Sequence, residues 1–122
     1  MHYAIEADAE FLRVRMWGRD TDEPPSHVCE AVLKESERLG RKRILIELDQ
    51  KFPLSPSGQF DLVTRLPDIG LTSRHSIALV HRTPTGQMAN EFINVVAVNR
   101  GLAVRNFGSV EEAAAWLRLR AA

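Results

Sequence analysis

The C-terminal quarter of the chain constrains the fold most strongly, because its residue pattern predicts a short strand that leads into a capped helix. The strand is expected over Leu102–Phe107. Ser109 and Glu112 follow with the spacing of a capping box, in which each side chain can satisfy a free backbone N–H at the start of a helix. The residues of this helix that should face inward are Val110, Ala113, Ala114 and Leu117. A strand joined directly to an amphipathic helix is typical of an α/β domain.

The N-terminal half predicts a sheet that is partly antiparallel and partly parallel. Residues 2–7 and 11–17 each alternate in polarity and are separated by a charged segment, which indicates an antiparallel hairpin. The Pro24–Pro25 pair fits the first turn of a helix, and Gly40 is placed to end it. The largely apolar run Arg43–Asp49 is typical of a central strand that is covered on both faces.

The middle of the chain adds two further helices and a strand. Helices are expected over 57–66 and 84–100, on either side of a strand over His75–His81. The predicted order is therefore β-β-α-β-α-β-α-β-α, in a mixed sheet with helices packed on it. A chain of 122 residues has the length of one ordinary domain, so we expect a single α/β domain over residues 1–122.

Composition narrows the functional classes. Sixteen basic and sixteen acidic side chains give a formal net charge of zero, which argues against non-specific binding of nucleic acid. Cys29 is the one cysteine and has no partner for an internal disulfide, and the N-terminus lacks the pattern of a signal peptide. No apolar run has the length of a membrane span. These features predict a cytoplasmic protein.

The last strand and helix also resemble a known family. The residues that carry the resemblance are Phe107, Glu111, Glu112, Ala113, Trp116 and Leu117. They are similar to the C-terminal signature of the SpoIIAA-like branch of the STAS superfamily, and the predicted order of elements resembles the STAS fold. The resemblance implies a domain that binds other molecules rather than one that turns over a substrate.

In STAS anti-sigma factor antagonists, a central strand ends in Asp and a Ser-Gly pair starts the next helix, where a partner kinase phosphorylates the serine. By resemblance, Asp49 and Ser57-Gly58 occupy these places, but Ser55-Pro56 precedes the pair where the family has Asp-Ser. The superfamily is also similar in shape to lipid carriers of the CRAL-TRIO type, which implies a hydrophobic ligand as a second option.

Independently of the family, ligands of open parallel sheets gather at the carboxyl ends of strands and near helix N-termini. Asp49 with Ser57 and Gly58 marks one such end, and Arg82 with Thr83 marks another that could bind an anion. The plainer interpretation is that Ser57 and Thr83 cap helices and that Asp49 bonds within its own turn.

Catalytic and metal chemistry have weaker support. Ser57, His81 and Asp49 are expected at the same end of the sheet, as in a nucleophile, base and acid, but no Gly-x-Ser-x-Gly elbow accompanies them. The four histidines lack the paired spacing of metal ligands, so we predict no metal and no cofactor.

Two surface patterns point to binding. One face of a strand carries Phe11, Arg13, Arg15 and Trp17, where aromatic and guanidinium groups can anchor a partner. A sheet face that is covered by a helix or half-exposed, with extended arginines, would show the same pattern. The expected helix over 87–100 is apolar on more than one stripe. A dimer partner, a protein target, a hydrophobic ligand or its own domain could cover it.

The sequence therefore predicts a non-catalytic binding or regulatory module of STAS-like type that acts through protein–protein contact, with a homodimer among the partners considered. The candidate contact residues are Asp49, Ser57, Gly58, Arg82 and Thr83. The alternative is a carrier or sensor of a small hydrophobic or anionic ligand, held near Phe60, Met88 and Phe92 in an apolar cavity of roughly 300 Å³ or more. A hydrolase that uses Ser57 and His81 is a third option.

Overall fold

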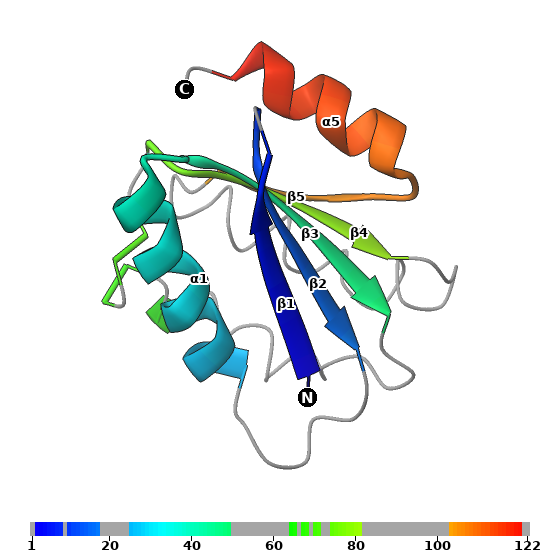
Figure 1. Cartoon of the computed structure of the whole chain (residues 1–122). Coiled ribbons are helices and arrows are strands. Elements are labelled where there is room, and N and C mark those ends of the chain that lie inside the picture. Colours follow the sequence, from blue (N-terminus) through cyan, green and yellow to red (C-terminus); the bar gives the residue numbers. More distant parts are fainter. Residues whose placement is uncertain are drawn as a thin grey trace.

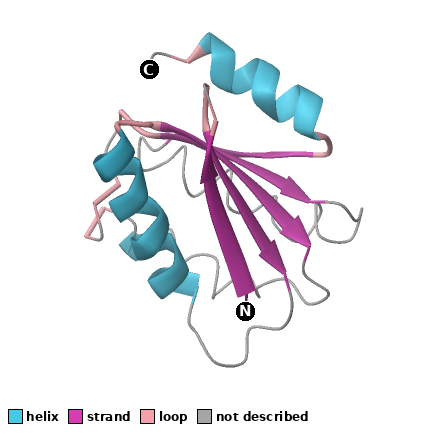
Figure 2. Ribbon diagram, viewed as in Figure 1, coloured by secondary structure: helices cyan, strands magenta, loops and turns pink. Residues whose placement is uncertain are grey.

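A computed structural model of the chain describes residues 2–8, 10–17, 25–49, 64–65, 67–68, 70–71, 74–81 and 103–120. These residues form a five-stranded mixed sheet with one helix on each face (Figures 1 and 2). The predicted α/β class and mixed sheet are therefore confirmed.

The sheet begins with the predicted hairpin. Strand β1, His2–Ala7, pairs antiparallel with strand β2, Leu12–Trp17. Asp8 shapes the turn between them, because its Oδ1 accepts the backbone N–H groups of Glu10 at 2.8 Å and Phe11 at 2.7 Å. These two hydrogen bonds hold the pKa of the Asp8 carboxyl below its ordinary value, and the bond from Phe11 has the larger effect.

The other strands run parallel to β2. Strands β3, Arg43–Asp49, β4, Ser76–His81, and β5, Ala103–Phe107, complete the order β1-β2-β3-β4-β5. Strand β3 is central, and its four residues Ile44, Leu45, Ile46 and Leu48 are buried, as the apolar run predicts.

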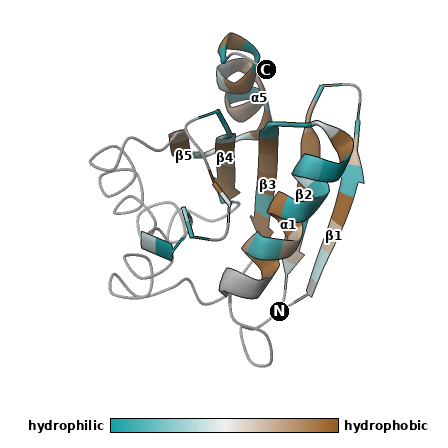
Figure 3. Ribbon diagram, turned by 90° about the vertical axis from the view of Figure 1, so that its left-hand side faces the viewer, coloured by the Kyte–Doolittle hydropathy of each residue, from teal (hydrophilic) through white to brown (hydrophobic). Residues whose placement is uncertain are grey.

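Helix α1, Pro25–Leu39, covers one face of the sheet, which we call the α1 face. Its residues Val28, Val32 and Leu33 pack against alternate residues of the strands. The strand residues of this cluster are Leu12, Val14, Met16, Ile44, Ile46, Leu48, Ile77, Leu79 and Val104. Figure 3 shows that hydrophobic residues dominate β3 and β4, whereas α1 has residues of both kinds. Gly40 follows the helix with a φ of +66°, as expected of a C-terminal stop.

Helix α5, Val110–Leu119, covers part of the opposite face, which we call the α5 face. Its N-cap is Ser109, whose Oγ accepts the Glu112 N–H at 3.2 Å, as the capping box predicts. The buried residues of this second cluster are Phe11, Leu45, Ala78, Val80, Ala113, Ala114 and Leu117. Neither described helix is long and apolar enough to cross a membrane.

The described residues contain two helices, α1 and α5, where the sequence predicts four. The other two, expected over 57–66 and 84–100, lie outside the described residues, apart from Thr64 and Arg65, which are helical. Strand bounds differ from expectation by one residue at β4 and β5, which begin at Ser76 and Ala103.

Candidate functional site

Of the residues selected from the sequence as contacts or pocket, the structure describes one, Asp49. It is the last residue of β3, is exposed, and lies opposite Trp17 of β2. The others lie outside the described residues: Ser57, Gly58, Phe60, Arg82, Thr83, Met88 and Phe92.

The strand ends do not bring Asp49 and His81 together. His81 is paired with Leu48, the residue before Asp49, and neighbouring residues of a strand point to opposite faces. His81 therefore belongs to the α1 face and Asp49 to the α5 face. The His81 side chain is buried, and this desolvation lowers its pKa to about 4, so the ring is neutral near pH 7.

The strand order also bears on where a ligand could bind. In open α/β sheets, a ligand crevice forms where the strand order reverses and neighbouring connections diverge to opposite faces. The five described strands follow one another in sequence order, so no such reversal occurs among them. The segments that follow β3 and β4 lie outside the described residues, so the strand-end site stays a prediction, and the described faces of the sheet are a second place for a binding surface.

The α5 face is covered unevenly. Helix α5 contacts mainly β3, β4 and β5, so the hairpin of β1 and β2 extends past it. The hairpin residues on this face alternate along the two strands and are exposed or half-buried. They are Ala4, Glu6, Arg13, Arg15 and Trp17, and together we call them the hairpin patch.

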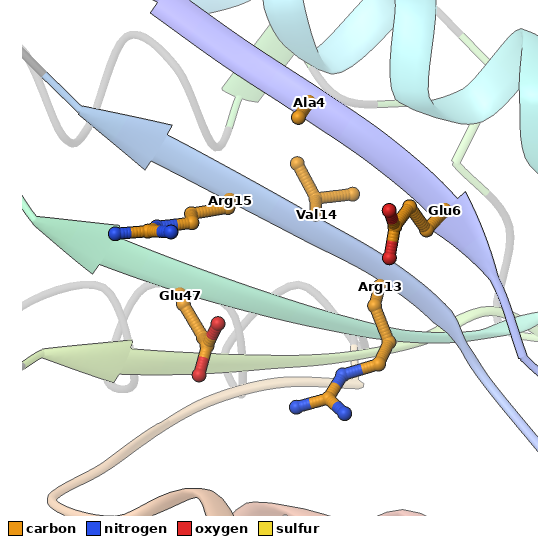
Figure 4. Close-up of a pocket in the computed structure, with 6 residues that line it drawn as sticks. All are labelled: Ala4, Glu6, Arg13, Val14, Arg15 and Glu47. Carbon is orange, nitrogen blue, oxygen red and sulfur yellow. The ribbon is translucent and has the colours of Figure 1, made fainter.

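A hollow of about 300 Å³ lies on the patch. It is lined by Ala4, Glu6, Arg13, Val14, Arg15 and Glu47, so four of the six residues are charged. In Figure 4, the Arg13 and Arg15 side chains leave β2 in different directions, and the Glu47 carboxylate is drawn between them. The charges around the hollow therefore alternate in sign. This hollow is a different place from the apolar pocket expected near Phe60, Met88 and Phe92, which lies outside the described residues.

The strand register sets the charge pattern. Arg13 lies directly opposite Glu6 on β1, and Arg15 lies opposite Ala4 on β1 and opposite Glu47 on β3. Neither arginine forms an ion pair with another residue of the described ranges. Guanidinium groups bind carboxylates, and both side chains can be reached from solvent, because Arg13 is half-buried and Arg15 is exposed.

Trp17 provides the apolar part of the patch. Its side chain is 38% exposed, and the Arg15 Cζ lies 5.9 Å from the centre of its ring, within cation–π range. Exposed tryptophan and arginine are the residue types that contribute most binding energy in protein interfaces. The sequence pattern identified Arg13, Arg15 and Trp17, but Ala4, Glu6 and Glu47 join them only through the register.

Phe11 shares the face of these residues, as its spacing predicts, yet it is buried. The guanidinium carbons of Arg43 and Arg118 each lie 5.7 Å from the centre of its ring, and Phe11 packs in the cluster beneath α5. Phe11 therefore helps to hold the helix on the sheet and is not part of the patch.

Other chemistry-bearing groups of the described ranges do not assemble into a site. No three His, Cys, Asp or Glu side chains gather there in a way that could hold a metal ion. Cys29 packs against the cluster on the α1 face, and burial raises the pKa of its thiol to about 11.

Comparisons of the chain with protein-family models, with curated proteins and with solved structures found no match.

Proposed function

We propose that this protein is a non-catalytic binding or regulatory module that acts through protein–protein contact, and that the hairpin patch is its contact surface. The observation that carries the proposal is the combination of the exposed Trp17 with two arginines that have no ionic partner in the described ranges. The module is STAS-like in type, a proposal that rests on the resemblance of the last strand and helix to that superfamily.

The chemistry of the patch favours a protein over a small hydrophobic ligand. An apolar ligand is best held in an enclosed apolar cavity, whereas this hollow is partly open and four of its six lining residues are charged. Guanidinium groups beside an exposed indole fit the mixed polar and aromatic chemistry of protein interfaces. A small anion bound by Arg13 and Arg15 is the competing occupant.

Site-specific photo-crosslinking tests the contact surface. Trp17 is replaced by p-benzoylphenylalanine, which keeps an aromatic side chain, and the protein is irradiated in cell extract. The matched control carries the same group at Leu119, which is 87% exposed on α5. We expect protein adducts at position 17 that decrease when Arg13→Ala and Arg15→Ala are added, and no comparable adduct at position 119.

Equal adducts at the two positions, or none at position 17, would contradict the proposal. Native mass spectrometry of the purified protein addresses the competing occupant. A bound small molecule that is lost in the Arg13→Ala, Arg15→Ala variant would favour a ligand carrier instead.

A further inference from the structure

The hairpin patch is complementary in charge to a second copy of itself. Glu6 and Arg13 lie directly opposite each other on neighbouring strands, as do Ala4 and Arg15. A two-fold axis that runs parallel to these strands, in the plane between two stacked sheets, exchanges the places of β1 and β2. It therefore sets Arg13 of one copy over Glu6 of the other, twice, and Arg15 over Ala4.

From this register we propose that the partner bound at the hairpin patch is a second copy of this chain, joined face to face about such an axis. The inference rests on the proposed function and names the partner of the same surface. Symmetric two-fold dimers use one surface patch on both subunits, so that surface has to be self-complementary. The exchange of Glu6 and Arg13 meets this requirement without any conformational change.

Packing and net charge are consistent with the same arrangement. Ala4 is small and exposed, so it leaves room for the long Arg15 side chain of the other copy. Trp17 is opposite His2 in the same register, so the axis sets it over position 2 of the other copy. Helix α5 lies mainly over β3, β4 and β5, so the hairpin end of this face can be approached by another sheet. The formal net charge of zero gives no long-range repulsion between copies.

The patch is small, which sets the expected strength. Two strands of six residues are only about 20 Å long and about 5 Å apart. The area that they can bury is therefore smaller than the area that a tight complex usually buries. We therefore expect a dimer that forms with rising protein concentration, in the micromolar to millimolar range, and that weakens with added salt.

A charge exchange between two variants tests the pairing. Arg13→Glu leaves two carboxylates at the paired positions, and Glu6→Arg leaves two guanidinium groups. In each variant alone, like charges face each other across the axis. The dissociation constant of its dimer should therefore rise by about tenfold or more relative to the unmodified chain. An equal mixture restores both opposite pairs and should dimerise again, as should the double variant Glu6→Arg, Arg13→Glu. Sedimentation velocity over a concentration series measures all five samples, with Glu111→Arg, an exposed position on α5, as the matched charge control.

The outcomes separate the dimer from the more general proposal. Dimerisation of the unmodified chain that is lost in both single variants and recovered in the mixture supports the pairing. A monomer throughout the concentration range overturns it, and so does a dimer that is indifferent to the charge changes. A monomer whose position 17 still crosslinks to a different protein would overturn the self-pairing and leave the contact surface standing. Circular dichroism of each variant establishes that the fold is retained.

Discussion

Arg118, near the end of α5, forms a bidentate contact with the carboxylate of Glu10 in the hairpin turn. Its Nε donates to Glu10 Oε2 at 2.8 Å and its Nη2 donates to Oε1 at 3.2 Å, across 108 residues of sequence. The same guanidinium lies over the Phe11 ring. The contact therefore joins the last helix to the first hairpin, and it fixes the end of α5 beside the hairpin patch.

We expect this ion pair to contribute measurably to stability, because its geometry is bidentate. Glu10→Ala and Arg118→Ala should each lower the midpoint of urea unfolding, and the double variant should be less destabilised than the sum of the two. The double-mutant cycle cancels the loss of the Arg118 contact with Phe11. The coupling should decrease with salt and exceed that of Lys34 and Glu30, whose single contact on α1 is 3.6 Å long. Additive single effects would show that the pair is not coupled.

The pair also has a predictable response to acid. The hydrogen bonds from Arg118 hold the pKa of Glu10 below its ordinary value. A carboxyl whose pKa is lower in the folded state stabilises that state above its unfolded pKa, and this contribution is lost as the pH falls through the folded value. The coupling measured near neutral pH should therefore disappear in strong acid.

Two leucines of α5 provide a matched test of how the helix is seated. Leu117 is fully buried in the cluster beneath the helix, whereas Leu119 is 87% exposed. Leu117→Ala should lower the free energy of unfolding by about 2–5 kcal/mol, because it removes buried methyl groups and leaves a cavity. Leu119→Ala should change it by less than about 0.5 kcal/mol. Urea unfolding followed by circular dichroism measures both, and similar losses for the two variants would mean that α5 faces the sheet differently.

Much of the described fold could be predicted from local pattern. The run Arg43–Asp49 predicts a strand with the same bounds as β3, because an apolar run flanked by charged residues gives clear ends. The start of α5 was equally clear, since Ser109 and Glu112 specify a cap within four residues of sequence. Both signals are short-range and do not depend on the rest of the chain.

The binding surface could be predicted only in part. The alternation along β2 placed Arg13, Arg15 and Trp17 on one face, and the structure places them there. Whether that face is open depends on where α5 lies, and its position is set by contacts such as Glu10 with Arg118, which leave no local signal. The addition of Glu6 and Ala4 depends on the register of the hairpin, and a shift of one residue would turn them to the other face.

The prediction of a site at the strand ends rests on the tendency of ligands to gather at the carboxyl ends of parallel strands, near helix N-termini. Of that set the structure describes Asp49, which lies at an exposed strand end opposite Trp17, with His81 on the other face. The other strand-end candidates lie outside the described residues and stay predictions.

The single thiol allows a direct test of packing on the α1 face. Burial raises the pKa of Cys29 to about 11, so almost no thiolate is present near pH 8. We expect Cys29 to react with Ellman's reagent at least about 100-fold more slowly in the folded protein than in urea, where its pKa returns to about 8.5. Because the chain has one cysteine, the absorbance reports this residue alone. A rate in the folded protein near that of the unfolded chain would show that the thiol is accessible.

His81 should make the protein sensitive to mild acid. Desolvation lowers its pKa to about 4 in the folded state, against 6.5 for an ordinary histidine. Between these values the unfolded chain binds a proton that the folded chain does not, so stability rises with pH across this window. The contribution of His81 is fully present above about pH 6.5 and is lost as the pH falls toward 4, by up to about 3 kcal/mol in total. His81→Gln keeps a polar side chain that does not titrate, and the difference in unfolding free energy between the two proteins should change across this window and level off outside it. An NMR titration of the imidazole gives the pKa directly, and a midpoint near 6.5 in the folded protein would show that the ring is not desolvated in its place on the α1 face.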